Sequence, residues 1–452
     1  MSRGLGGFVS HGTSTWEEQL ASRHEALTAA DYNRTKAGLG SVNDAPDTES
    51  AKAAGVAAHY NSISDRHRTL SDGSDILHLR NLNNWIKSVL ISKHLPKGRG
   101  KMGHAVLDLA CGKGGDMLKF KVGGCAMYVG IDIAAQSVRD AVERYNGANG
   151  RPGMPYAATF MAGDFCAVSV AEQLPPDLWF ALASCQFALH YSFASESRAR
   201  ALLQNATARL AIGGTFVATV PDADVLVRRL RAADALTFGN SLYRVEFAGT
   251  HASKGFPASA SPFGLAYRFT LKEAVDECEE YLVHLPTLRR LAAEQGLEML
   301  YARNFTDFFA EECHVKAHAE LLERMKVLPA GGVPLSEDEW EVAHTYMAIA
   351  FRKQAETASG ASSAPSTPQL RRNPGNQRQS ESDIIHLDGP ALAAAATGAA
   401  KRPHPAGDGT NPPEEESRKR ARSAASAAAD PPPAGERRAK IEYTAATDDL
   451  FD

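Results

Sequence analysis

The sequence predicts an α/β fold built on a mostly parallel sheet, and three observations lead to this prediction. Residues 58 to 353 alternate short apolar runs with amphipathic stretches, as a chain of alternating strands and helices does. A glycine-rich loop follows one of the apolar runs, and acidic residues follow three successive runs. Because the carboxyl ends of parallel strands share one edge of a sheet, we expect the loop and the acids to meet there.

Composition divides the 452-residue chain into three parts. Residues 1–57 are rich in Ser, Thr, Gly, Ala and Asp without an apolar period, so we expect a flexible arm. Residues 58–353 form the predicted domain, with an inserted substrate-binding subregion near 230–285. Residues 354–452 have low complexity and should be disordered, because they cannot bury enough apolar surface to offset the entropy of ordering. One exception within them is IIHL, residues 384–387, which is too short to fold alone.

Charge and cysteine usage limit the classes of function. The net charge is −4, so any RNA site must be a local patch. The six cysteines form no CxxC pair, which predicts reduced thiols, an intracellular protein and no metal site. No apolar run approaches the roughly 20 residues of a membrane span, and no secretory signal begins the chain, so we expect a soluble protein. Basic clusters at 401–402 and 418–422 predict a bipartite nuclear import signal, with a solubilising charge run as the alternative.

The segment from 104 to 120, HAVLDLACGKGGDMLKF, is the strongest local motif. It predicts a buried strand, a tight glycine loop from 111 to 115 and a helix from Asp116, which suits a ligand at a helix N-terminus. The next strand ends in Asp132, where a carboxylate can accept from ribose hydroxyls, and a third ends in Asp164, near the adenine. Carboxylates would repel pyrophosphate, so a nucleoside ligand is favoured. Each aspartate taken alone could be a helix N-cap or a turn residue.

Six blocks carry a resemblance to a known family. They are LRNLNNWIKSVLI (79–91), DLACGKGGD (108–116), SCQFALHYSF (184–193), TVPDADV (219–225), FGNSLY (238–243) and EEYLV (279–283). The glycine loop followed by GID and GDF resembles motif I onward of class I S-adenosylmethionine methyltransferases. All six blocks together, over residues 58–352, look like the eukaryotic mRNA cap guanine-N7 methyltransferases.

The resemblance implies a fold, a cofactor and partners. The fold would be a seven-stranded, mostly parallel Rossmann-like sheet with helices on both faces. The enzyme would transfer a methyl group from S-adenosylmethionine to N7 of the 5′ guanosine cap. Its partners would be capped pre-mRNA and the capping machinery or RNA polymerase II, and it would be a nuclear monomer. The alternatives are a methyltransferase of another RNA position or a small molecule, and an inert cap-binding scaffold.

The resemblance also assigns residues to the cofactor. Lys87 would lie near its carboxylate, where an ammonium group makes a charge-assisted contact. Most class members have Gly where this chain has Ala110, whose methyl group should crowd the homocysteine moiety. The cofactor-binding set is Lys87, Ala110, Gly112, Asp132, Asp164, Gln186 and Tyr191.

The cap-binding set follows from the same resemblance. Glu280 would accept from guanine N1–H and N2–H₂ together; the alternative is an exposed acid on a helix over EAVDECEEY. Tyr346 would close the far wall of the cap pocket; the alternative is that its side chain only packs in the core. Lys113, Lys119 and Arg144 would contact the triphosphate bridge, although the last two could be solvated helix charges. The full set is Asn83, Asn84, Lys113, Lys119, Arg144, His190, Pro221, Glu280 and Tyr346.

Phe187, His190 and Tyr191 form a cluster suited to enclosing a purine and aligning the reactants. The alternative is an aromatic run that enters the core, although His190 would be a poor core residue. Guanine N7 already carries an in-plane lone pair, so methyl transfer needs no proton removed. We therefore assign no general acid or base, and catalysis would rest on in-line alignment.

Overall fold

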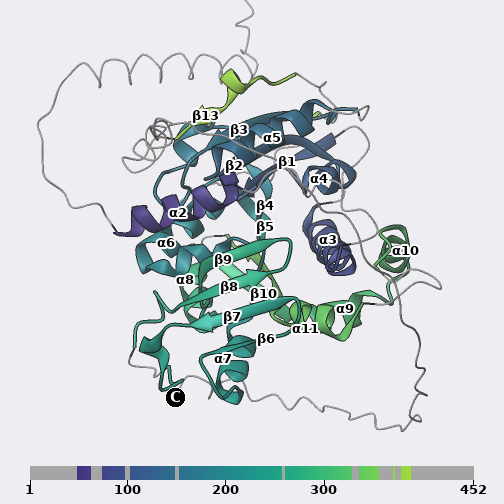
Figure 1. Cartoon of the computed structure of the whole chain (residues 1–452). Coiled ribbons are helices and arrows are strands. Elements are labelled where there is room, and N and C mark those ends of the chain that lie inside the picture. Colours follow the sequence, from purple (N-terminus) through teal and green to yellow (C-terminus); the bar gives the residue numbers. More distant parts are fainter. Residues whose placement is uncertain are drawn as a thin grey trace, which may run out of the picture.

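A computed structural model describes residues 48–62, 74–96, 102–147, 152–256, 260–327, 335–355, 370–371 and 378–387. Its centre is a twisted sheet in the strand order β10-β11-β5-β4-β1-β2-β3-β13 (Figure 1). The seven main strands are β1 (Met102–Leu109), β2 (Cys125–Asp132), β3 (Ala157–Ala162), β4 (Phe180–Gln186), β5 (Leu210–Pro221), β10 (Leu297–Asn304) and β11 (Tyr346–Lys353). Strand β11 runs antiparallel to both β5 and β10, and the strands from β5 to β3 are parallel. The predicted fold class is confirmed.

Helices cover both faces of this sheet. Helices α3 (Leu77–His94), α4 (Met117–Gly123) and α5 (Ala135–Asn146) share one core with alternate residues of β1 and β2, such as Val106 and Tyr128. Helices α6 (Glu196–Thr207) and α8 (Leu285–Glu294) share a second core with the intervening residues, such as Leu107 and Val129. Successive strand residues point to opposite faces, so the two cores lie on opposite sides of the sheet.

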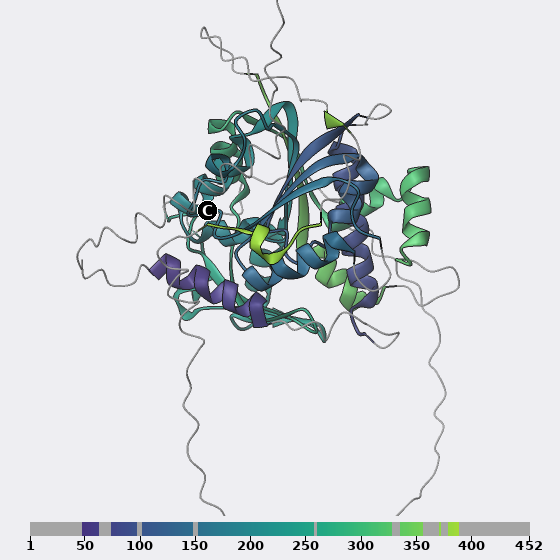
Figure 2. The ribbon, with the colours of Figure 1, turned by 90° about the horizontal axis from the view of Figure 1, so that it is seen from above.

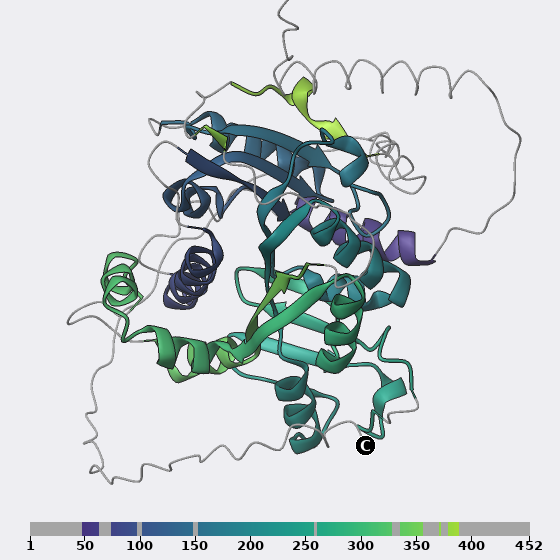
Figure 3. The same cartoon turned by 180° about the vertical axis from the view of Figure 1, so that it is seen from behind.

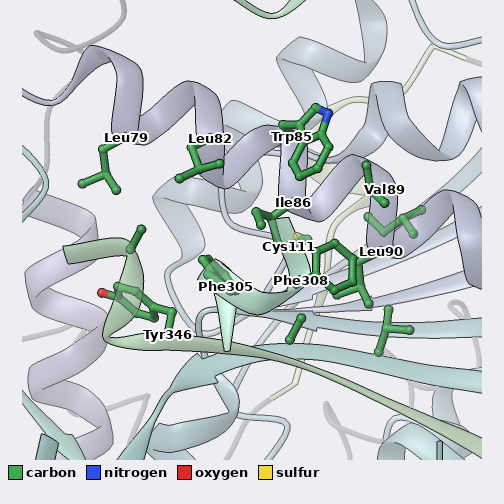
Figure 4. Packing of buried hydrophobic residues seen from close by; sticks show 14 of the residues in the cluster. Leu79, Leu82, Trp85, Ile86, Val89, Leu90, Cys111, Phe305, Phe308 and Tyr346 are labelled. Atoms are coloured by element: carbon green, nitrogen blue, oxygen red, sulfur yellow. The ribbon is translucent and has the colours of Figure 1, made fainter. Parts of the chain in front are cut away.

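The buried face of α3 shows why that segment is a helix. Its apolar residues recur at spacings of three and four, which places them on one stripe of an α-helix. Figure 4 shows this stripe packed over Phe305 and Phe308. These two residues come from α9 (Phe305–Glu312), which lies beside α3 with α10 (Lys316–Arg324) and α11 (Glu337–His344) (Figure 3).

A second, smaller sheet corresponds to the predicted insertion near 230–285. It follows α7 (Ala223–Ala232) and contains β6 (Thr237–Gly239), β7 (Tyr243–Phe247), β8 (Ala266–Leu271) and β9 (Val275–Tyr281). All its pairings are antiparallel. Glu280 lies in β9 and is 4% exposed, so the alternative of an exposed acid on a helix is wrong. From Val275 onward the acid-rich run EAVDECEEY is a strand, because its register on β8 gives it a cross-strand partner.

Both ends of the predicted domain differ from the boundaries set by composition. Helix α2 (Thr48–Ser62) begins inside the predicted arm and packs on α5 and β9. Two short strands of the predicted tail, β12 (Leu370–Arg371) and β13 (Ile385–His386), join β1 and β3. Sheet pairing thus supplies IIHL with the partner that it lacks on its own. The basic clusters at 401–402 and 418–422 lie outside the described residues.

Among the described residues, no helix is both long enough and apolar enough to span a bilayer. All six cysteines are free, and no group of three or more metal-ligating side chains gathers in the described ranges.

Candidate active site

A cavity of about 580 Å³ opens at the carboxyl ends of β1, β2, β3 and β4. Its walls come from the glycine loop, the loops after β2 and β3, the end of β4, helix α2 and strand β9. All seven residues predicted to bind the cofactor line it: Lys87, Ala110, Gly112, Asp132, Asp164, Gln186 and Tyr191. The fold therefore brings together residues that are up to 104 positions apart, from Lys87 of α3 to Tyr191 after β4.

The glycine loop turns sharply at the floor of the cavity. Gly112 and Gly114 have φ angles of 50° and 70°, which glycine adopts at little cost. Ala110 has a φ angle of 60° in the same left-handed region, where a Cβ atom costs about 1 kcal/mol or more. This strain gives a physical reason why most class members carry glycine at that position.

Asp132 ends β2 and holds the glycine loop. Its carboxylate accepts from the Gly112 N–H at 2.8 Å and from the Ala134 N–H at 2.9 Å. Burial raises the pKa of Asp132, and these two N–H donors oppose that rise. Asp132 is thus a turn residue, which was the alternative for each aspartate taken alone. It also lines the cavity, and its carboxylate oxygens keep lone pairs that can accept from a ligand.

Asp164 is paired with an arginine that the sequence did not single out. Arg198 on α6 donates from two guanidinium nitrogens to the two carboxylate oxygens, at 2.9 and 3.2 Å. The Cys166 N–H adds a turn bond at 2.9 Å. Both Asp164 and Arg198 line the cavity, so this bidentate pair fixes the direction of the carboxylate.

The opposite wall carries an amide oxygen without a partner. Gln186 Nε2 donates to Ser184 Oγ at 3.1 Å, but the buried Gln186 Oε1 has no hydrogen-bond partner among the described residues. A buried acceptor left unpaired costs about 1–3 kcal/mol, so its place on the cavity wall suits a bound donor. The Tyr191 hydroxyl lies 3.1 Å from the Tyr60 hydroxyl of α2 and 3.5 Å from Cys278 Sγ.

A cluster of charges lies beside the glycine loop. Lys87 Nζ is 2.9 Å from Asp116 Oδ1, and Lys119 Nζ is 2.7 Å from the same atom. Lys119 also donates to Asn84 Oδ1 at 3.1 Å. Burial alone would raise the pKa of Asp116, but the two ammonium groups bring it well below its usual range. Lys119 is therefore a mostly shielded cation paired with Asp116, so the alternative of a solvated helix charge is wrong for it.

The other phosphate candidates lie around the same loop. Lys113 Nζ is 2.9 Å from Asp140 Oδ2 of α5. Arg144, also on α5, places a guanidinium nitrogen 3.9 Å from where a Cβ on Gly115 would stand. Asn83, a predicted cap residue on α3, has an unpaired buried amide oxygen among the described residues. Lys113, Arg144 and Asn83 do not line the 580 Å³ cavity.

A second group of predicted cap residues gathers between the small sheet and β11. Glu280 Oε2 accepts from the Tyr267 hydroxyl at 2.8 Å, and His190 Nε2 lies 3.5 Å from Glu280 Oε1. Tyr346 begins β11 opposite Pro221 of β5, and its ring centroid is 5.1 Å from that of Phe187. Tyr346 also packs against Phe269 and against Phe305, which Figure 4 shows beside it, so ordinary packing is part of its role.

The sequence missed the residues that α2 contributes to the cavity. Lys52, His59 and Tyr60 line it; Lys52 falls in the predicted arm, and His59 and Tyr60 stand at the start of the predicted domain without having been singled out. Helix α2 lacks a strong apolar stripe, so its position depends on tertiary contacts such as that of the Tyr60 hydroxyl with the Tyr191 hydroxyl at 3.1 Å. The run AKAAGVAAHY has good helix formers, which was the one available signal.

The cavity fits S-adenosylmethionine. Its lining combines acidic side chains that end β2 and follow β3 with Lys87 and the unpaired Gln186 amide oxygen, which suits a ligand with a nucleoside part and an amino-acid part. A seven-stranded sheet in this order, with a glycine loop after β1, defines a class I S-adenosylmethionine-dependent methyltransferase. Residues 44–354 match the family model described as the mRNA (guanine-N(7))-methyltransferase domain. The chain belongs to this family, and S-adenosylmethionine is its cofactor.

Curated relatives support the same family. The chain is 42% identical over 317 residues to mRNA cap guanine-N(7) methyltransferase 1 of Oryza sativa, a match that covers 69% of this chain and 84% of the relative. It is 38% identical over 340 residues to the Arabidopsis thaliana protein of the same name, with coverage of 74% and 88%. The Drosophila melanogaster mRNA cap guanine-N(7) methyltransferase is 37% identical over 351 residues, with coverage of 68% and 79%.

Proposed function

We propose that this enzyme methylates N7 of the mRNA 5′ guanosine cap by direct in-line transfer, with the guanine held between Glu280, His190 and Tyr346. S-adenosylmethionine supplies the methyl group. Membership of the family supports the activity itself and argues against a small-molecule substrate. The assignment of residues to the cap rests on the contacts that follow.

The main observation is that two aromatic contacts link the cofactor cavity to the Glu280 cluster. His190 packs on Tyr191 with ring centroids 4.2 Å apart, and its Nε2 atom lies 3.5 Å from Glu280. Phe187 lines the cavity and packs edge-to-face on Tyr346. A guanine that donated hydrogen bonds to Glu280 would thus contact aromatic rings that also pack against the cofactor cavity. In-line transfer requires the base and the cofactor to be this close.

The contacts of Glu280 and His190 favour binding over proton transfer. Glu280 accepts from Tyr267, and a carboxylate that accepts hydrogen bonds is suited to reading the guanine donors. Guanine N7 needs no proton removed, so the residues only have to orient it. The aromatic walls and the buried carboxylate would stabilise the positive charge as it moves from sulfur to guanine.

The test is methyl transfer from labelled S-adenosylmethionine to GpppG-capped RNA, followed by product mapping. Label should appear only at N7 of the cap guanine, and uncapped RNA of the same sequence should take up none. Label at another position, or on uncapped RNA, would contradict the cap assignment. Cofactor binding without any transfer would favour an inert cap-binding scaffold.

We also propose nuclear action, because the family methylates mRNA caps and capping is a nuclear process. Capped pre-mRNA would be the substrate, the protein would be a monomer, and the capping machinery or RNA polymerase II would recruit it. The clusters at 401–402 and 418–422 would direct import. Replacing the basic residues of both clusters with Gln should make a tagged protein cytoplasmic, and unchanged nuclear accumulation would rule them out.

A further inference from the structure

Residues 378–387 return from the predicted tail to the open edge of the main sheet. Figure 1 shows this segment beside β3, and Figure 2 shows it from above, near α5. Ile385 and His386 pair in parallel with Met161 and Ala162, and the Leu387 N–H donates to the Ala162 carbonyl at 2.8 Å. The segment therefore continues the sheet by one short strand and covers an edge that would otherwise be exposed.

The segment is held at both ends, by buried side chains at one and by backbone hydrogen bonds at the other. Ile384 and Leu387 are 4% and 6% exposed, and they belong to the two cores on opposite faces of the sheet. At the other end, Asn146 of α5 exchanges two hydrogen bonds with the Gln379 backbone, at 2.7 and 2.8 Å. The burial of these two aliphatic side chains stabilises the segment more than the exposed Arg139–Glu381 ion pair does, because exposed ion pairs contribute little.

Leu387 lies directly against the loop that lines the cofactor cavity. A Cβ atom on Gly163 would stand 2.6 Å from Leu387 Cβ and 2.8 Å from its carbonyl oxygen, so the two backbones are in close contact. The Gly163 N–H in turn donates to the Asp132 carbonyl at 2.9 Å. Gly163 immediately precedes Asp164, so Leu387 packs on the link between the two acids of the cavity.

We propose that residues 378–387 form a strap that holds the Gly163–Cys166 loop in its cofactor-binding position, with Leu387 as a positioning residue. Edge loops open more readily than core strands, and a loop that is already ordered binds its ligand with a smaller entropy cost. Without the strap, the edge of β3 and the Asp164 loop would lose their outer packing. This inference rests on the proposed assignment of Asp132 and Asp164 to the cofactor's adenosine.

The first test uses point variants of the full-length chain. If Leu387→Asp leaves the loop in its binding geometry about one-tenth of the time, the Kd for S-adenosylmethionine rises roughly ten-fold. KM for the cofactor should rise in parallel, while kcat and the cap KM change less than about two-fold at saturating cofactor. Leu387→Met, which keeps an apolar side chain of similar size, should retain the wild-type Kd and KM for the cofactor. His386→Ser, an exposed neighbour in the same strand, is the matched control and should change nothing.

A second test separates positioning from general loss of structure. An internal deletion of residues 378–387 should weaken cofactor binding, and a synthetic peptide of the same residues should restore it. Amide hydrogen exchange should quicken at Gly163 to Cys166 in Leu387→Asp, while the β4 and β5 amides keep their protection. An unchanged Kd in Leu387→Asp, or protection lost equally across the sheet, would overturn the strap.

The proposed cofactor assignment can fail independently. If Asp132→Ala binds S-adenosylmethionine normally, the adenosine assignment is wrong, whatever Leu387 does. If Asp132→Ala weakens binding while Leu387→Asp and the internal deletion do not, the assignment stands and only the strap is wrong.

Discussion

The substrate assignment depends most on Glu280, so its removal is the sharpest test. Glu280 Oε2 accepts one hydrogen bond, from Tyr267, and Oε1 lies 3.5 Å from a His190 nitrogen that has no hydrogen-bond partner among the described residues. Each carboxylate oxygen can accept two hydrogen bonds, so both retain room for a guanine donor. Guanine N1–H would donate to one of these oxygens, and N2–H₂ would donate to the other.

The magnitude follows from that geometry. A hydrogen bond to a charged group contributes about 1.5–3 kcal/mol, which corresponds to a factor of roughly 10 to 150 in kcat/KM. An inosine cap lacks the amino group and loses one of the two bonds, so the wild-type enzyme should prefer guanosine by this factor. Glu280→Ala should lose both bonds on guanosine and most of the preference. Glu280→Gln should fall between them, because its amide offers a single acceptor oxygen.

The assay is kcat/KM for guanosine- and inosine-capped RNA with each variant, beside cofactor Kd as a check of folding. Glu246→Ala is the matched control, since it removes a half-exposed carboxylate of the same small sheet that pairs only at the surface with Arg244. It should leave the preference intact. A preference for guanosine that survives Glu280→Ala undiminished would refute the assignment and move base recognition to another residue.

Three further outcomes are expected. Asp132→Ala should weaken S-adenosylmethionine binding by about 1–3 kcal/mol in calorimetry, and normal affinity in the folded variant would exclude the ribose contact. Cap binding should weaken as the salt concentration rises. If Lys113 or Arg144 contacts a phosphate, its replacement by Gln should reduce the slope of log binding constant against log salt concentration by about one. Lys119→Gln would also disturb the ion pair of Lys119 with Asp116. Burial and the nearby Asp116 charge raise the pKa of Asp108 to about 8, so between pH 4 and 8 the folded protein holds a proton that the unfolded chain releases. The unfolding free energy should therefore fall as pH rises from 5 to 8, and Asp108→Asn should flatten that dependence in urea titrations at each pH.

The apolar alternation and the glycine loop were sufficient to predict the main sheet. Strands β1 to β4 follow local runs of apolar residues, and their polar ends meet because parallel strands share a carboxyl edge. This is why Asp132 and Asp164 could be assigned to one cavity from sequence order alone, whereas Gln186 was assigned by the family resemblance. The same rule does not reach Arg198, because its pairing with Asp164 depends on how α6 packs against the sheet.

The sequence by itself determined the class of fold, the cofactor edge of the sheet and the family, because each depends on short motifs in order. Only the tertiary structure decided that α2 and residues 378–387 belong to the domain. Their contacts, such as Tyr60 with Tyr191 and Leu387 with Gly163, join residues more than 130 positions apart. Local composition carries no information about such partners, so segments without a core of their own seemed to lack structure. The burial of Glu280 was decided in the same way, by the strand across from it.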